Sequence, residues 1–265
     1  VETTLRGIAP HIENNDIEKV VVRNRSLRWP IPTGLDSKLK HQLVQSVSRR
    51  GKYLLIKTEA GTLILHLGMS GSLRILKTGE AVEKHDHFEI QFQDGKCLRL
   101  RDPRRFGCVL FTKDNPLEHE LLVKLGPEPF SDEFTAEMLY EKSRKKQLTI
   151  KQFIMDSKTV VGVGNIYASE SLFLACIHPK KKAGKVSKQK FIELYEAIKQ
   201  ILADAIRQGG TTLKDFTASD GKPGYFKQEL RVYDRAGEPC VKCGKAITQS
   251  VIGQRSTYYC THCQK

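Results

Sequence analysis

Four cysteines near the C-terminus constrain the fold of this chain more than any other feature. They form two Cys-x2-Cys pairs, Cys240 with Cys243 and Cys260 with Cys263, separated by sixteen residues. This spacing is typical of a closed, tetrahedral four-cysteine zinc ribbon, in which each pair presents two thiolates to the same ion. Because so short a segment cannot bury a sizeable core, we expect the ion to stabilise its fold.

Two other chemistries use paired cysteines, and the sequence disfavours both. Disulfides belong to secreted domains, whereas the sequence opens without a signal-peptide pattern. A redox Cys-x-x-Cys motif starts a helix, whereas both pairs here lie in a tail rich in glycine and lysine. We therefore expect one structural Zn²⁺ per chain, with no open coordination position for catalysis. The remaining cysteines are interpreted as buried small apolar residues: Cys97, Cys108 and Cys176.

The charge balance indicates a polyanionic partner. Of the 265 residues, 44 are Lys or Arg and 30 are Asp or Glu, which gives a formal charge of +14. A surface this basic favours nucleic acid. An anionic membrane is the alternative partner, but the sequence has no basic amphipathic helix and no apolar run long enough to cross a bilayer.

The first half of the chain has the apolar pattern of a β-rich domain. Val1, Leu5, Ile8 and Ile12 recur at helical spacing and predict a short opening helix, with Pro10 in its last turn. Alternating or continuous apolar runs follow at 17–22, 53–57, 62–67, 88–92 and 97–100. These runs predict two packed sheets.

The pattern changes at residues 125–129 (LGPEP), which predict a linker, and helical periodicity follows. The clearest helix has Ser187 as its N-cap and ends at residues 209–210, which are both glycine. Its predicted buried face consists of Phe191, Leu194, Ile198, Ile201 and Ala205. The polar stretch 211–225 has no periodicity, and a loop of that length is usually functional or disordered.

Two short segments could bind phosphate. Residues 162–165 (GVGN) predict a turn in which Asn165 caps a helix whose N-terminal N–H groups suit an anion. An ordinary tight turn before a buried helix is the alternative. Residues 49–52 (RRGK) predict a phosphate clamp at the entry to a strand, or else a solvated charge cluster. The neighbouring arginines are expected to lower the pKa of Lys52, which favours proton transfer.

Two further segments could pry apart stacked bases. Residues 102–107 (DPRRFG) predict a turn that presents Arg104 and Arg105 beside an exposed Phe106. A core position for this phenylalanine is the alternative. Met69 lies between glycines, which is unusual for a core methionine and suitable for a second wedge.

Together these segments resemble the formamidopyrimidine-DNA glycosylase family, the bacterial type of 8-oxoguanine DNA glycosylase/AP lyase. The resemblance runs from one end of the chain to the other in the family's order. The matching stretches are HLGMSGSLRI, KHDHFEI, DPRRFG, LGPEP, VVGVGNIYASESLF, HP, QGGTTLKDF, SDGKPGYF, the cysteine set and the closing CQK.

The resemblance implies an α+β multidomain protein. An N-terminal β-sandwich with flanking helices would span 1–125 and a hinge 126–131. A helical helix-two-turn-helix domain would span 132–230, with a lesion-capture loop at 211–225, and a zinc ribbon would span 231–265. DNA would lie across the cleft between the two lobes.

The implied activity is base-excision repair of double-stranded DNA. Such an enzyme flips an oxidised purine, 8-oxoguanine or a formamidopyrimidine, out of the duplex. An amine then attacks C1′, and the resulting Schiff base permits β,δ-elimination, so one protein is both glycosylase and AP lyase. We expect a monomer that binds one Zn²⁺ and no membrane, and that is located in the cytoplasm with the nucleoid.

The resemblance also implies roles for individual residues. Met69, Arg104 and Phe106 would fill the gap left by the flipped nucleotide. Lys52 and Arg255 would contact phosphate and carry catalytic roles in the two eliminations, although electrostatic stabilisation suits a guanidinium better than proton donation. The DNA-binding set is His66, Met69, His85, Arg104, Arg105, Phe106, Lys146, Asn165, Lys214 and Tyr233.

The resemblance departs from the family at the front of the sequence. Family members carry Pro-Glu-Leu-Pro-Glu immediately before the Val-Glu-Thr that opens this sequence, and the proline amine and adjacent glutamate are the nucleophile and the acid. Glu2 is not that glutamate, because its Val-Glu-Thr context comes later in the family's order. A chain that begins at Val1 is therefore expected to bind abasic DNA without cleaving it.

Three alternative functions remain at this point. An endonuclease VIII-like enzyme for oxidised pyrimidines shares the architecture, but the DPRRFG segment, Met69 and the long loop favour the purine enzyme. A non-catalytic binder of damaged DNA fits a chain without the nucleophile. A zinc-ribbon transcription accessory protein leaves the wedge residues and the capture loop unexplained.

Overall fold

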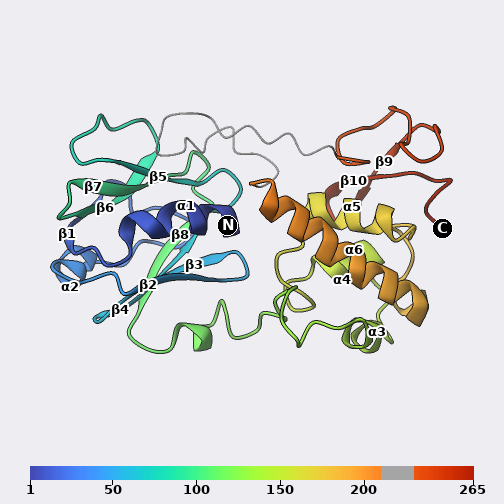
Figure 1. Cartoon of the computed structure of the whole chain (residues 1–265), viewed down its shortest axis with the longest axis horizontal. Helices are drawn as coiled ribbons and strands as arrows, with labels where there is room; N and C mark the ends of the chain where they lie inside the picture. Colours follow the sequence, from blue (N-terminus) through green and yellow to red (C-terminus); the bar gives the residue numbers. More distant parts are fainter. Residues whose placement is uncertain (210–229) are drawn as a thin grey trace. The chain divides into compact units, whose positions relative to one another are not determined.

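The computed structural model describes residues 1–209 and 230–265 (Figure 1). It divides into two compact units, which are described separately. The first unit contains Val1–Val123, and the second contains Lys124–Gln208 with the described part of Lys227–Lys265. The predicted capture loop 211–225, with Lys214, lies outside the described residues.

The first unit is built on two antiparallel four-stranded sheets. In spatial order, one sheet consists of β1 (Ile17–Val22), β6 (Asp86–Phe92), β7 (Lys96–Arg101) and β5 (Ser72–Lys77). The other consists of β2 (Ser46–Arg50), β3 (Tyr53–Thr58), β4 (Gly61–His66) and β8 (Cys108–Thr112). Apolar residues of both sheets share one buried cluster, so the predicted pair of packed sheets is confirmed.

The first unit also contains helices, and the longest of them packs on the sandwich core. Helix α1 (Glu2–Ile12) includes Pro10 in its last turn, as predicted, and buries Ile8 and Ile12 in the sandwich core. Its first residue, Glu2, accepts hydrogen bonds from Arg6 at 2.8 Å and from Arg49 of β2 at 2.6 Å. The start of α1 is therefore fixed against the end of β2. Two short elements also belong to this unit, α2 (Leu35–Leu39) and the 3₁₀ helix η1 (Pro116–Glu118).

The second unit is helical. Its helices are α3 (Ala136–Ser143), α4 (Ile150–Met155), α5 (Asn165–Leu174), η2 (Ala183–Lys185) and α6 (Lys188–Arg207). The predicted helix is α6, whose N-cap Ser187 accepts a hydrogen bond from the Lys190 amide. All five residues predicted for its buried face are buried. Among the described residues, no helix is long and apolar enough to span a membrane.

The C-terminal ribbon packs on the helices of the same unit. Its hairpin pairs β9 (Thr248–Ile252) with β10 (Arg255–Tyr259). Phe173 of α5 shares a buried cluster with Tyr258, Cys260 and other ribbon residues. The buried Gln264 accepts from the Cys260 amide and donates to the Ile177 carbonyl, both at 2.9 Å. One side chain thus joins the cysteine loop to the helices.

Candidate nucleic-acid interface and metal site

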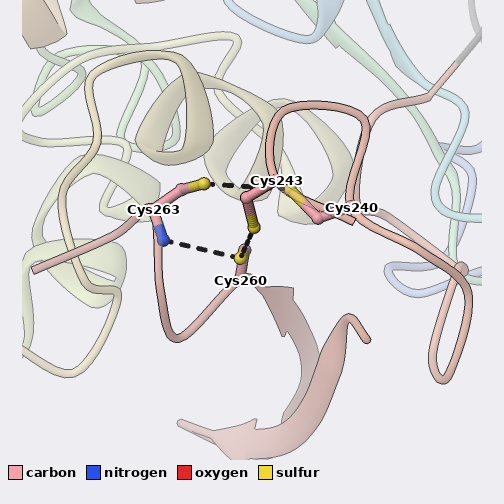
Figure 2. A group of neighbouring side chains, drawn as sticks. All are labelled: Cys240, Cys243, Cys260 and Cys263. Carbon is pink, nitrogen blue, oxygen red and sulfur yellow. Dashed lines mark hydrogen bonds between the residues drawn. The ribbon is translucent and has the colours of Figure 1, made fainter. Parts of the chain in front are cut away.

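The four ribbon cysteines converge on one point (Figure 2). Their sulfur atoms all lie within 4.8 Å of one another, with Cys240 and Cys263 3.9 Å apart and Cys243 and Cys260 3.5 Å apart. Four sulfurs at about 2.3 Å from a tetrahedral zinc ion would be about 3.8 Å apart. Backbone amides of Lys242 and residue 263 also donate to these sulfurs. The four cysteines are therefore positioned to bind one metal ion and fit structural zinc.

The first unit exposes two large apolar side chains on neighbouring loops. Met69, between β4 and β5, is 68% exposed, and Phe106, between β7 and β8, is 45% exposed. The guanidinium carbon of Arg104 lies 4.8 Å from the centre of the Phe106 ring. Phe106 is therefore no core anchor, and the arginine covers part of the ring while its charge stays available.

The two loops touch backbone to backbone. A Cβ added to Gly68 would lie 2.7 Å from the carbonyl carbon of Phe106, and one added to Gly107 would lie 2.6 Å from the His66 carbonyl oxygen. Contacts that short essentially never occur for real Cβ atoms. Glycine at both positions therefore lets the loop of Met69 and the loop of Phe106 pack directly on each other.

His66, at the end of β4, is held as a neutral imidazole. Its Nδ1 accepts a hydrogen bond from the Gly68 amide at 2.9 Å, and its ring lies 4.8 Å from that of Tyr53. Burial, with the positive charges of Lys52 and Arg28, lowers the pKa of His66 to about 4. A neutral ring that accepts at Nδ1 carries its proton on Nε2, which can donate to a phosphate oxygen.

The cationic segment at residues 49–52 lies at a hairpin turn. Arg49 and Arg50 end β2, Gly51 has φ of +58°, and Lys52 is exposed in the turn before β3. The expectation that these cations mark the entry to one strand is thus refined, because they join two strands. The proton-transfer role expected for Lys52 stays a prediction.

His85 and Arg105 both adopt left-handed backbone conformations, with φ of +78° and +56°. Such angles are uncommon outside glycine and cost energy unless the surroundings impose them. The His85 carbonyl accepts from the Asp102 amide at 3.0 Å, and the Arg105 amide donates to the Asp102 carbonyl at 3.2 Å. These backbone hydrogen bonds to Asp102 thus fix the backbone at both predicted DNA contacts.

In the second unit, Asn165 does not cap α5 as predicted. The N-cap is Gly164, which is extended, with φ of −91° and ψ of −176°, so Asn165 is already the first helical residue. Its side-chain amide donates to the Ser256 carbonyl of β10 at 3.0 Å. Asn165 therefore links the start of α5 to the ribbon hairpin.

Lys151 of α4 binds the same hairpin and was missed by the sequence reasoning. Its side chain is fully buried, and its Nζ donates to the Ser256 carbonyl at 3.1 Å and to the Thr257 hydroxyl at 2.7 Å. Burial, with the positive charge of Arg255, lowers the pKa of Lys151 to about 8. The only sequence signal is a lysine within the apolar run IKQFIM, which does not distinguish a buried amine from a solvated one.

Glu170 of α5 is a second residue that the sequence reasoning missed. Its buried carboxylate accepts from the amides of Arg231, Val232 and Tyr233 at 3.0, 2.9 and 2.9 Å. The Tyr233 ring packs edge-on against Tyr258, with ring centres 5.0 Å apart. Both contacts hold Tyr233 in place at the entry to the ribbon.

The two remaining predicted contacts of this unit are exposed. Lys146 lies in the connection between α3 and α4, and Arg255 begins β10. The guanidinium of Arg144 donates to the carbonyls of Gly184 and Val186 at 2.9 and 2.8 Å, which fixes the backbone beside Lys146. Of the three remaining cysteines, Cys97 and Cys108 are buried as predicted, whereas Cys176 is partly exposed because it follows the end of α5.

The predicted site residues thus form two sets. The first unit carries Lys52, His66, Met69, His85, Arg104, Arg105 and Phe106. The second carries Lys146, Asn165, Tyr233, Arg255 and the four cysteines. Lys214 lies beyond the described residues.

Family models match three consecutive parts of the chain. The formamidopyrimidine-DNA glycosylase N-terminal domain matches residues 1–109, and the H2TH domain of the same family matches 125–217. The zinc finger found in FPG and IleRS matches 237–265.

Similar proteins cover the whole chain. It is 56% identical to a formamidopyrimidine-DNA glycosylase of Saccharophagus degradans and 55% identical to one of Pseudomonas aeruginosa, covering 100% of this chain and 98% of each relative. The crystal structure of Lactococcus lactis Fpg, non-covalently bound to DNA containing an AP site, matches with a TM-score of 0.90, 32% identity and coverage of 100% and 97%. The Fpg of Thermus thermophilus matches with a TM-score of 0.87, 33% identity and the same coverage.

The order of the matched domains, the full-length relatives and the four converging cysteines all indicate the same family. The chain belongs to the formamidopyrimidine-DNA glycosylase family.

Proposed function

We propose that this protein excises oxidised purines from double-stranded DNA and cleaves the strand at the resulting abasic site. One observation carries the proposal: the chain matches, over its full length, structures of Lactococcus lactis Fpg in complex with DNA that contains an abasic site or Fapy-dG. Membership of a DNA glycosylase/AP lyase family gives the reaction type, and the lesion class is the inference.

We assign opening of the duplex to the first unit. Met69 and Phe106 are exposed, apolar and held on loops that pack on each other, and Arg104 lies beside the phenylalanine. Side chains of this kind insert between base steps, and the energy gained by burying them offsets part of the cost of unstacking. The flipped base leaves a gap that these side chains would fill.

We assign phosphate contacts to residues of both units. His66, neutral and able to donate from Nε2, Lys52 and the DNA-facing His85 and Arg105 belong to the first unit. Lys146, Asn165, Tyr233 and Arg255 belong to the second, and Lys214 would add a contact from the capture loop. Positive charge near the departing phosphates would stabilise both eliminations, which is the role proposed for Lys52 and Arg255.

The amine that attacks C1′ would come from a proline before Val1, by resemblance to the family. The start of α1 supports this placement, because Glu2 binds Arg49 near the end of β2, which leads directly into the turn that contains Lys52. A peptide preceding Val1 would therefore enter the first unit beside Lys52. The adjacent glutamate of that peptide would act as the acid.

We also propose the boundaries of the domains and the cellular location of the protein. The proposed domain boundaries are 1–125, 126–131, 132–230 and 231–265. They are supported by the boundary between the two compact units after Val123, and by the unmatched segment between the N-terminal family model, which ends at 109, and the H2TH model, which begins at 125. A monomer in the cytoplasm, associated with the nucleoid, suits a basic chain that acts on chromosomal DNA.

A substrate comparison tests the lesion class. The full chain, extended by Pro-Glu-Leu-Pro-Glu before Val1, would be incubated with otherwise identical duplexes containing 8-oxoguanine, a formamidopyrimidine or dihydrouracil. We expect base release and β,δ-elimination products from the two purine lesions, with far less from dihydrouracil. Preferential cleavage of dihydrouracil would instead assign the chain to oxidised pyrimidines.

A further inference from the structure

Asp102 connects the loops of both exposed apolar side chains. It is fully buried, with 0% of its surface exposed. Its Oδ2 accepts from the Gly107 amide at 2.7 Å, and its Oδ1 accepts from the Ser70 hydroxyl at 3.1 Å. Gly107 directly follows Phe106, and Ser70 directly follows Met69. One carboxylate therefore binds the residue next to each wedge.

The backbone of Asp102 extends the same connection to a third segment. Its amide donates to the His85 carbonyl at 3.0 Å, and its carbonyl lies 3.0 Å from Nε2 of the buried His87. The same carbonyl accepts from the Arg105 amide at 3.2 Å. Three segments that carry predicted DNA contacts thus meet at a single residue.

A buried carboxylate is costly unless hydrogen bonds compensate for its lost hydration. A purely apolar residue at this position would fill space without that cost. The hydrogen bonds of Asp102 instead specify a direction and a distance for both loops, and the glycines at 68 and 107 leave no side chain between the loop backbones. The arrangement favours one fixed spacing between Met69 and Phe106.

We propose that Asp102 is a positioning residue that couples Met69 and Phe106 into one rigid wedge before DNA is bound. The inference rests on the proposed role of these side chains in opening the duplex. A flexible pair of loops would lose conformational entropy when it enters the base stack, whereas a coupled pair has already lost it on folding. Asp102 thereby favours the opened duplex without touching it.

Binding to two duplexes tests the proposal without requiring catalysis. One duplex contains a tetrahydrofuran abasic-site analogue with 2-aminopurine opposite, whose fluorescence rises when stacking is broken, and the other is undamaged. Asp102→Ala is expected to lower affinity for the abasic duplex about tenfold, because two hydrogen bonds to a charged group are lost. Affinity for the undamaged duplex should stay the same, and the fluorescence rise should shrink.

Related variants are expected to lower the affinity for the abasic duplex by different amounts. Ser70→Ala removes one of the two links and should give a smaller loss than Asp102→Ala. Asp102→Asn keeps an acceptor for the Gly107 amide and can donate to the Ser70 hydroxyl, so it should restore most of the affinity. The double variant Asp102→Ala with Phe106→Ala should bind the abasic duplex within about twofold of Phe106→Ala alone, because coupled residues are not additive.

Glu89→Gln is the matched control for folding. Glu89 is equally buried in the same unit, and its ion pairs are with Arg23 and Arg99, at 2.8 and 2.6 Å, rather than with either loop. A general loss of stability should affect both duplexes in parallel in this variant. The same parallel loss in Asp102→Ala would show a merely structural role and overturn the proposal.

The outcomes separate the inference from the function on which it rests. If Phe106→Ala impairs capture and Asp102→Ala does not, the positioning role of Asp102 is wrong and the wedge remains. If Phe106→Ala leaves capture and fluorescence unchanged, the wedge role itself is wrong, and the role of Asp102 is rejected with it.

Discussion

The loops of Met69 and Phe106 and the zinc ribbon position their proposed DNA contacts in different ways. The loops of Met69 and Phe106 are held by glycines that allow backbone contact and by one buried carboxylate. The ribbon hairpin that carries Arg255 is held by four cysteines placed for a metal ion and by side chains of α4 and α5. A large sandwich core can support such loops without a metal ion, whereas a short ribbon has little core and needs the ion.

Metal removal should give the largest difference between the two regions. Cys260→Ser, or chelation, is expected to abolish measurable DNA binding while the first unit stays folded, since structural zinc contributes on the order of 10 kcal/mol to the fold it binds. Hydrogen exchange resolved along the chain would show loss of protection in 231–265 and its retention in β1–β8. Fully active protein that contains no zinc by metal analysis would refute this assignment.

Salt dependence should separate phosphate contacts from the wedge. Lys52→Ala and Arg255→Ala are each expected to weaken binding to any duplex and to lower the slope of log K against log salt by roughly one unit. Phe106→Ala should leave the slope unchanged and impair lesion capture. Lys96→Ala, which removes a partly exposed lysine paired with Asp94 in another hairpin, is the control and should change neither quantity. Equal slope changes in all four variants would contradict this division of roles.

Individual helices and strands show what the sequence could and could not predict. The cysteine spacing predicted the ribbon. Ser187 predicted the N-cap of α6, and the clean apolar face of this helix predicted its buried residues. Strand β5 was missed because Arg74 interrupts its apolar pattern, and this arginine pairs with Asp86. Strand β2 was missed because only Val47 of its five residues is buried.

The missed site residues share a physical cause. Glu170 and Lys151 are charged residues whose partners, Tyr233 and Ser256, are distant in sequence, so no local pattern marks them. The wrong cap at Asn165 arose because glycine can also occupy an N-cap, and local propensity alone does not decide between neighbours. The DNA-binding roles of Lys146 and Arg255 came only from the resemblance, because exposed basic residues look alike in a basic sequence.

Alkaline pH should affect the second unit through Lys151. The pKa of Lys151 is about 8 in the folded chain, against an ordinary value of 10.5. Between these values the unfolded chain binds the extra proton, so the contribution of Lys151 to stability rises with pH from 8 to 10.5, by up to about 1 kcal/mol per pH unit. Denaturant unfolding of the native chain and of Lys151→Met across this range would measure the difference. If the difference in unfolding free energy between the two chains does not change with pH, Lys151 does not lose its proton in the folded chain over this range.

Acidic pH should affect the first unit by a comparable amount through His66. Its pKa is about 4 in the folded chain, against an ordinary value of 6.5. The unfolded chain binds the extra proton between these values, so stability falls as pH falls from 6.5 to 4, by up to about 1 kcal/mol per pH unit. His66→Gln should remove this part of the acid sensitivity in denaturant unfolding. An unchanged pH dependence in that variant would show that His66 is not the titrating group.

Borohydride trapping tests the central claim most directly. Two chains, one verified by mass to begin at Val1 and one carrying Pro-Glu-Leu-Pro-Glu before it, would be mixed with an 8-oxoguanine duplex and sodium borohydride. We predict a covalent protein–DNA adduct with the extended chain and none with the other, because the proposed mechanism places the attacking amine and its acid in the added peptide. Absence of an adduct with the extended, zinc-loaded chain would contradict the account. Equal trapping by both chains would also contradict it and would make Lys52 the first nucleophile to test.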